Sequence, residues 1–244
     1  MDQVSAIAAS GFRARMESLD LLANNMANSS TAGYKGDGEF YSVYTSEAAD
    51  ADGAGSPTAL PMVQRQYTDF AQGIIENTNN PLDLALSGKG LFVVNGPNGP
   101  LYTRNGNFKL SPNGAVSTNE GYALMLQGGK QLKVDPTRPF EVSQDGTVKQ
   151  NGDEIGQLQI AEFKDRSSIV KQGFNYFRNA GTQKPEVASS VQVQQGKLEA
   201  SNVNAAHGAV RLVGVMRQFE VMQKAISISN EMGRQAIEEV AKVS

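Results

Sequence analysis

The chain has no cysteine, and its 244 residues include a single histidine. The missing cysteine excludes disulfides, thiolate metal sites and cysteine nucleophiles. The lone His207 has no second histidine with which to form an ordinary zinc site, so we expect it to have a structural or surface role. The formal charge of −3 and the pI near 5.3 give no electrostatic case for nucleic-acid binding.

Long apolar runs are missing as well. No stretch approaches the roughly 18 apolar residues of a membrane span, and the N-terminus lacks the basic and apolar regions of a cleaved signal peptide. We therefore expect no direct membrane insertion. Such a chain is either cytoplasmic or exported by a route that needs no cleaved signal.

The usual motifs of catalysis are also absent. Gly88-Lys89-Gly90 lacks the third glycine of a dinucleotide loop, and there is no phosphate loop and no Gly-x-Ser-x-Gly elbow. Asp83 and Asp135 have no second carboxylate at a spacing typical of an acid/base pair. We expect no enzyme, no cofactor, no metal and no small-molecule substrate. A ligand-binding module on the β region, or an adhesin stalk with helical ends, stays open as an alternative.

Both ends of the chain carry the spacing of heptad helices. Residues 209–243 predict a helix about 50 Å long, and residues 3–28 predict a second one. The C-terminal seam comprises Ala209, Leu212, Met216, Phe219, Gln223, Ile226, Asn230, Gly233, Ile237 and Val240. The N-terminal seam comprises Val4, Ile7, Gly11, Ala14, Ser18, Leu21, Asn25 and Asn28, beside a stripe of Ala8, Phe12, Met16, Leu19, Leu22 and Met26. Two stripes on one helix imply neighbours on two sides, although an ordinary core helix is the more common case.

The middle of the chain has the pattern of short strands. Asn-Gly and Asp-Gly pairs recur between 95 and 152, separated by short apolar or alternating runs, which predicts repeated hairpins in a twisted sandwich or open barrel. We expect an α+β fold, with paired long N- and C-terminal helices as a coiled-coil-like stalk and an inserted all-β domain. The expected divisions are an N-terminal helix (1–33), an extended connector (34–77) with a loose tip at 46–57, a β domain (78–186), a return connector (187–207) and a C-terminal helix (208–244).

Four segments in order resemble the bacterial flagellar rod and hook family. Leu19–Asn28 with Thr31–Lys35 resembles the N-terminal signature of that family, and Pro81–Val94 resembles the start of its β domain. Tyr102–Phe108 resembles the hairpin that follows, and Gly196–Val203 with Met216–Glu220 resembles the C-terminal helix and its entry. The resemblance spans both ends and the middle of the chain.

The resemblance implies a structural protein whose terminal helices pair into an inner tube domain, with the β domain outside. Copies of the chain and other rod proteins would stack into a hollow shaft of the basal body across the periplasm, after passage through the flagellar type III export apparatus. Hook subunits usually carry a further outer domain, for which 244 residues leave no room, so rod is favoured. Phe219, Arg217–Glu220 and the loose region 37–57 favour the proximal over the distal rod, which stays as the alternative.

The terminal helices then supply the subunit interface. We predict interface contacts through Val4, Ile7, Gly11, Phe12, Leu19, Leu22, Asn24, Asn25, Asn28, Leu212, Met216, Phe219, Glu220, Gln223, Ile226, Asn230 and Ile237.

Overall fold

The computed structural model describes residues 2–45, 59–173, 175–188 and 190–243, without the side chains of 2–9, 40–45, 59–65, 229–230, 236–237 and 239–243. The loose tip expected at 46–57 lies outside the described residues. The chain forms two compact units. The helix–hairpin unit comprises residues 1–27, 37–69 and 204–244, and the β unit comprises 28–36 and 70–203.

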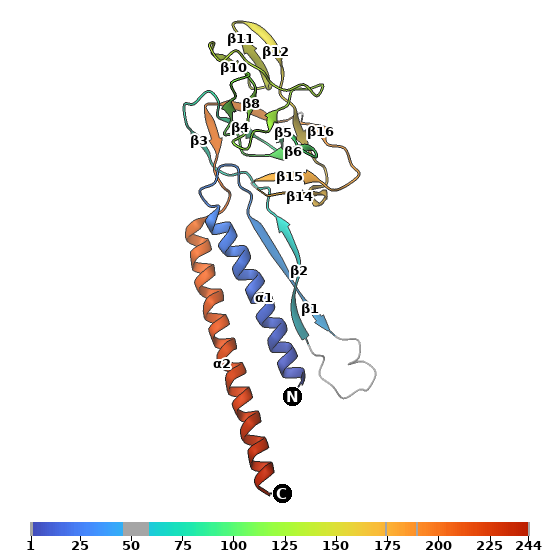
Figure 1. Ribbon diagram of the computed structural model, residues 1–244, viewed down its shortest axis with the longest axis vertical. Helices are drawn as coiled ribbons and strands as arrows, with labels where there is room; N and C mark the ends of the chain where they lie inside the picture. The colour runs from blue at the N-terminus through green and yellow to red at the C-terminus, as the bar shows by residue number, and fades with distance from the viewer. Residues whose placement is uncertain (1, 46–58, 174, 189, 244) are drawn as a thin grey trace. The chain divides into compact units, whose positions relative to one another are not determined.

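Two α-helices belong to the helix–hairpin unit (Figure 1). Helix α1 runs over Asp2–Ala27 and ends where residues 28–33 form turns closed by the bond from Thr31 N to Asn28 O (3.1 Å). Helix α2 runs over Ala205–Val243, and the side chain of Asn204 accepts a hydrogen bond from His207 N (3.0 Å) at its start. With 39 residues α2 is the longer helix, against 26 for α1.

The third element of this unit is a β-hairpin. Strand β1 (Asp37–Thr45) pairs antiparallel with β2 (Ala59–Thr68), with a register shift between Phe40 and Tyr41. The amide of Asn25 on α1 bonds both backbone groups of Asp37, donating to the carbonyl (2.7 Å) and accepting from the N–H (2.9 Å). The Ser18 hydroxyl of α1 donates to Glu39, which also pairs with Arg211 of α2 at 3.8 Å. The small and polar seam of α1 is therefore covered by the hairpin.

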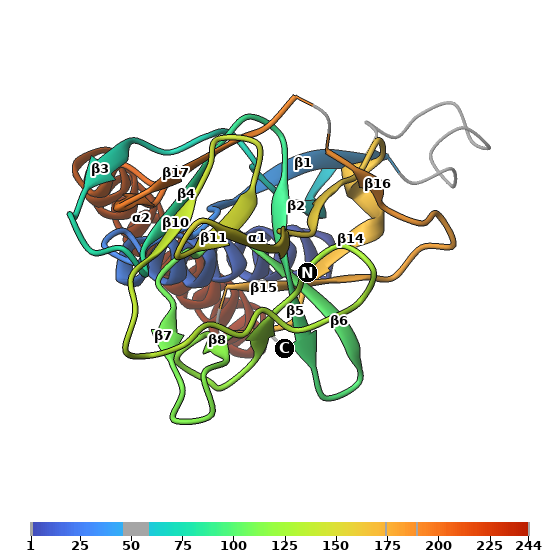
Figure 2. The ribbon, with the colours of Figure 1, turned by 90° about the horizontal axis from the view of Figure 1, so that it is seen from above.

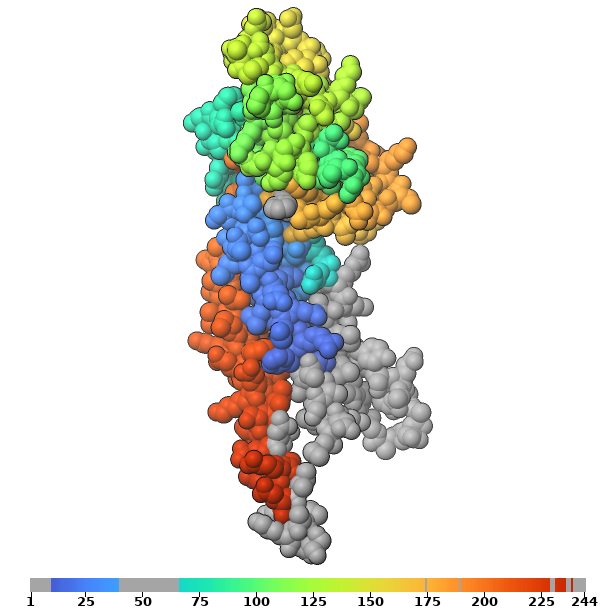
Figure 3. All heavy atoms as spheres, in the orientation of Figure 1, coloured from blue at the N-terminus to red at the C-terminus, as the bar shows by residue number. Residues whose placement is uncertain are grey.

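The other stripe of α1 packs on α2. The rings of Phe12 and Phe219 lie with centroids 4.3 Å apart, and Met26 lies beside Gly208. Figure 3 shows the blue surface of α1 running against the orange and red surface of α2. Helix α1 thus has its two neighbours within its own chain.

The expected fold class is wrong. The described residues form eighteen strands and only two α-helices, so the protein is mostly β. Only the C-terminal helix is long, and the N-terminal helix stops at Ala27 because the chain turns at 28–33 and enters the β unit. The second side of α1 is filled by a hairpin, and no coiled-coil stalk of two paired long helices forms.

The β unit contains sixteen short strands and one 3₁₀ turn. They are β3 (Ile75–Asn77), β4 (Leu84–Ser87), β5 (Leu91–Gly96), β6 (Gly99–Thr103), β7 (Lys109–Leu110), β8 (Val116–Ser117), β9 (Ala123–Leu124), β10 (Phe140–Val142), β11 (Thr147–Gln150), β12 (Asp153–Gln157), β13 (Ile160–Glu162), η2 (Arg166–Ser168), β14 (Ile169–Lys171), β15 (Tyr176–Asn179), β16 (Glu186–Val187), β17 (Gln192–Gln195) and β18 (Lys197–Glu199).

These strands form one large sheet and three small ones. The large sheet has the order β14-β15-β6-β5-β9-β8-β7, with β13 and β16 attached beside β5. The strands β10, β11 and β12 form a separate three-stranded sheet. The returning strands pair with the entering ones, β17 with β4 and β18 with β3 (Figure 2). Entry and exit of the chain are thereby held together.

The main core of the β unit lies around Leu84, Leu86, Phe92 and Phe108, which are almost fully buried. A second core cluster surrounds Phe177. No described helix is both long and apolar enough to cross a membrane.

Candidate functional site

The segments that carry the family resemblance meet in the β unit at one carboxylate. Glu199 ends β18, Lys35 lies in the segment 28–36, and Arg104 follows β6. All three side chains are buried, with 0% exposure for those of Lys35 and Glu199 and 3% for that of Arg104. We call these three residues the buried junction.

The junction is a carboxylate shared by two cations. Lys35 Nζ lies 2.5 Å from Glu199 Oε1, and Arg104 NH1 lies 3.0 Å from Glu199 Oε2. Gly73 N also donates to Oε1 at 2.9 Å. Both oxygens of the carboxylate thus have charged partners, which is the condition under which a buried ion pair is tolerated.

The two cations are completed by backbone carbonyls. Lys35 donates to Ala71 O at 2.6 Å, and Arg104 donates to Leu86 O at 2.9 Å and to Gly88 O. Burial lowers the pKa of the Arg104 guanidinium, and the charge of Glu199 counteracts that shift. Fixed carbonyl dipoles therefore support the cation for which Glu199 alone does not suffice.

The segment 28–36 reaches this junction through a close backbone approach. Gly33 N donates to Glu199 O at 2.6 Å, and Gly36 N donates to Asn202 Oδ1 at 2.8 Å. Gly33 has φ +68°, and a Cβ placed there would lie 2.3 Å from Asn105 N. Only glycine fits, because any side chain would strain the backbone and meet the loop that carries Arg104. The arrangement holds chain segments together and presents no reacting groups.

Sequence reasoning did not select any of these three residues. Arg104 was expected to be the charged shoulder of a turn, and Lys35 and Glu199 had no assigned partner. The available signal was that all three fall inside the segments that resemble the flagellar family. The sequence separation of 164 residues between Lys35 and Glu199 hides their pairing from any local pattern.

The predicted interface residues of α1 are divided between its two faces. Gly11, Leu22 and Asn25 are buried, Phe12 and Leu19 are half-buried. Asn24 is exposed, and Asn28 is half-buried in the turn after the helix. The side chains of Val4 and Ile7 lie outside the described residues. Asn25 in particular bonds its own hairpin, as described above.

The predicted interface residues of α2 also fall on two faces. Leu212, Phe219 and Ile226 are half-buried, within about 40° of one another around the helix, on the side of α1. Met216, Glu220 and Gln223 are exposed. The side chains of Asn230 and Ile237 lie outside the description.

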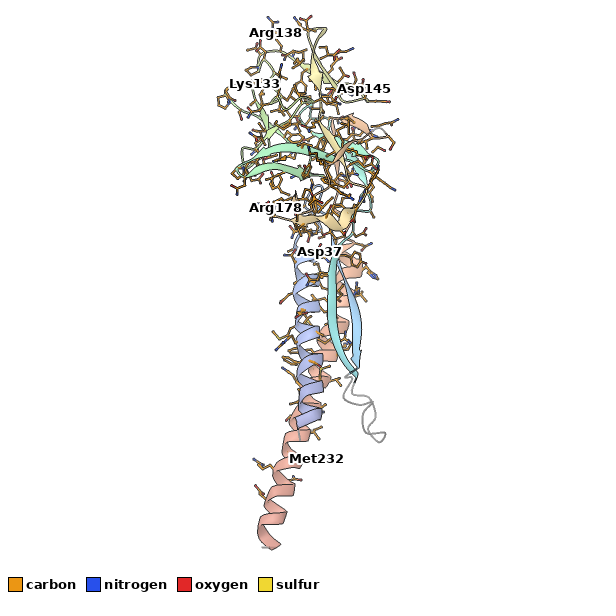
Figure 4. All side chains as sticks on the ribbon, turned by 90° about the vertical axis from the view of Figure 1, so that its right-hand side faces the viewer. Asp37, Lys133, Arg138, Asp145, Arg178 and Met232 are labelled. Atoms are coloured by element: carbon orange, nitrogen blue, oxygen red, sulfur yellow. The ribbon has the colours of Figure 1, made fainter. Side chains whose placement is uncertain are left out.

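A second apolar stripe of α2 was not predicted. Val210, Val221, Ile228 and Met232 also lie within about 40° of one another, on the opposite side of the helix from Phe219. They are exposed by 73%, 70%, 51% and 65%. Figure 4 marks Met232 on this helix. We call these four residues the outer stripe.

The described residues contain no cluster of three or more histidines and carboxylates that could hold a metal ion. The geometry thus points to two features, a junction that secures the chain and an outer stripe with large apolar side chains in solvent.

Comparison with known proteins gives matches over both parts of the chain. Residues 85–150 match the family model of the flagellar hook protein FlgE/F/G D1 domain, and residues 194–239 match that of the flagellar basal body rod FlgEFG protein C-terminal region. The chain is 34% identical to the flagellar basal-body rod protein FlgF of Caulobacter vibrioides over 230 residues, covering 93% of each chain. It is 30% identical to FlgF of Mesorhizobium japonicum, over 87% of this chain and 89% of the relative, and 31% identical to the rod protein FlgG of Caulobacter vibrioides, over 94% and 96%.

Proposed function

Because this chain belongs to the flagellar basal-body rod protein family, we propose that it is a proximal-rod subunit that assembles helically through its terminal helices. It is a structural subunit of the flagellar rod, and its place is the flagellar basal body. Its partners in this proposal are copies of itself and the neighbouring rod proteins. The part it plays is mechanical and not enzymatic.

The outer stripe is the observation that carries the assembly proposal. Burying a valine, isoleucine or methionine side chain is worth about 1.5–3 kcal/mol, and α2 leaves four of them in solvent along one line. Monomeric proteins seldom expose such a continuous apolar line unless it meets a partner. With α1 on one side and the outer stripe on the other, α2 has the two-sided surface that an open helical assembly requires.

The buried junction supports a mechanical role. It ties a segment next to α1 in sequence and a segment next to α2 to the same sheet of the β unit. Ion pairs without access to water are weakened little by salt. A subunit of a rotating shaft needs such a fixed connection between its parts.

The remaining assignments complete the proposal. Residues 1–33 and 208–244 contribute to the inner tube, and 78–186 stand outside it, joined by the connectors 34–77 and 187–207. The subunit reaches its position across the periplasm through the flagellar type III export apparatus without a cleaved signal. The proximal position rests on Phe219 and on the segment Arg217–Glu220. A distal-rod position is the alternative.

The substitution Val221→Asp tests the assembly proposal. Since Val221 is 70% exposed, the monomer should fold normally, while a carboxylate in a packed helix interface should block incorporation into the rod and abolish motility. Val170→Asp is the matched control, because Val170 is an exposed valine of the β unit. Normal motility of the Val221→Asp strain would refute assembly through the outer stripe.

Two further experiments separate the related readings. Phe219→Asp should block incorporation by a different route, because Phe219 packs on Phe12 and its loss should already loosen α1 from α2 in the monomer. A strain that lacks this chain decides its position. If basal bodies without it still accumulate the distal-rod protein, the proximal assignment is excluded.

A further inference from the structure

A pocket opens in the β unit beside the buried junction. It has about 240 Å³ of free space and is lined on one side by Phe70, Phe163 and Ile169, with Leu91 and Ala161 next to them. Its polar lining consists of Lys89, Arg104 and Arg166. Among the described residues, its lining contains three cations and no carboxylate.

The positive charge of this pocket is poorly neutralised. Glu199 is the carboxylate nearest in the structure to Arg104, and it is already shared with Lys35. The charge of Arg166 reaches Arg104 as well, since it lowers the pKa of Arg104 in addition to the larger effect of burial. The neighbouring Asp165 uses its Oδ1 to accept from Ser167 N at 2.9 Å, where it caps the 3₁₀ turn.

The two arginines are also held in place. Arg104 donates to Leu86 O and Gly88 O, which fixes its guanidinium. The guanidinium of Arg166 lies over the ring of Phe70, with Cζ 5.1 Å from the centroid, and donates to Phe70 O at 3.5 Å. Positively charged groups that are fixed before binding lose little conformational entropy when an anion arrives.

We propose that this pocket binds a small carboxylate with an apolar body, through Arg166, Lys89 and the exposed edge of Arg104. Guanidinium groups match the planar carboxylate, and the wall of Phe163 and Ile169 receives the apolar part. The free space is below the range for drug-sized ligands, which restricts the ligand to a few heavy atoms or to one side chain. A free organic acid and an acidic side chain of a neighbouring copy offer the same chemistry.

Titration of the dilute full-length chain with benzoate tests the proposal by ¹⁵N NMR. Benzoate should give saturable shifts of the backbone amides of Gly90, Leu91 and Ala161. The neutral isostere benzamide, and chloride at equal ionic strength, should not. Shifts of equal size with benzamide, or no saturable shifts with benzoate, would overturn the proposal.

Charge-removing variants locate the site. Arg166→Gln should weaken benzoate binding by about tenfold, since one charge-assisted interaction is lost. Lys89→Gln, at an exposed position where folding is safe, should weaken it by a smaller factor. Arg178→Gln is the matched control, because Arg178 is an exposed arginine of the same unit (Figure 4) and should leave binding unchanged. Equal affinity in Arg166→Gln and Arg178→Gln would refute the assigned pocket.

A concentration series distinguishes the two sources of the carboxylate. If a neighbouring copy supplies it, the same amides should shift as unlabelled chain is added, and benzoate should reverse the shift. If only free benzoate moves them, the ligand is a free acid. The binding result does not depend on the rod assignment, so a failure of either proposal is recognisable by itself.

Discussion

Replacing Glu199 with glutamine removes the one negative charge of the buried junction while keeping its shape. The side chain is fully buried, and its oxygens face Lys35 Nζ at 2.5 Å and Arg104 NH1 at 3.0 Å. Removing one member of a buried ion pair costs about 3–5 kcal/mol, because the partner charge stays buried without compensation. Here two cations are left, so we expect a loss near the upper end of that range. That is a large part of the 5–15 kcal/mol by which folded proteins are usually stable.

Urea unfolding followed by near-ultraviolet circular dichroism of the tyrosines measures this loss. With a slope of about 2 kcal/mol per molar urea, the midpoint for the β unit should fall by about 1.5–2.5 M. Glu141→Gln is the control, since Glu141 is exposed on β10 and the substitution changes the same charge. If the two variants have the same midpoint, the junction does not hold the β unit together.

The other predictions concern a backbone contact and a titration. Gly33→Ala should destabilise the β unit by about 2 kcal/mol more than Gly121→Ala in the same urea assay, because both have positive φ (+68° and +90°) but only Gly33 faces backbone atoms within 4 Å; equal losses would refute the close approach. The pKa of Asp145 should lie below its ordinary value because of the backbone N–H and then the hydroxyl of Thr147, and Thr147→Val should raise it only in part. Since that pKa is depressed in the folded state, its stabilising contribution is present above the unfolded pKa and disappears as the pH falls through the folded pKa, which ¹³C NMR of the carboxyl follows; an unchanged pKa in Thr147→Val would contradict the bond.

The helices could be located from sequence, but their partners could not. The heptad spacing led to two helices, and α1 and α2 cover almost those residues. The two stripes of α1 were assigned to other subunits, whereas a hairpin and α2 of the same chain occupy them. Spacing shows that a face needs a neighbour and contains no information about which segment supplies it.

The hairpin itself escaped prediction for local reasons. In Asp37–Thr45, aromatic residues occur on both faces, at Phe40 and Tyr41, so no alternation of polar and apolar residues is visible. Pro61 in β2 argues against a strand, and is tolerated because a two-stranded hairpin has only edges. The outer stripe was overlooked since the other seam of α2 is the more regular one.

The route of the chain through the β unit constrains the order in which the protein can fold. Residues 28–36 enter the unit first, but the carboxylate that neutralises Lys35 lies 164 residues further along. A chain delivered from its N-terminus therefore has an unpaired lysine at this position until Glu199 has followed it. Contacts between such distant residues form slowly, since the loop must close before it is stabilised. The subunit can remain pliable for most of its delivery and become rigid only when nearly its whole length has arrived.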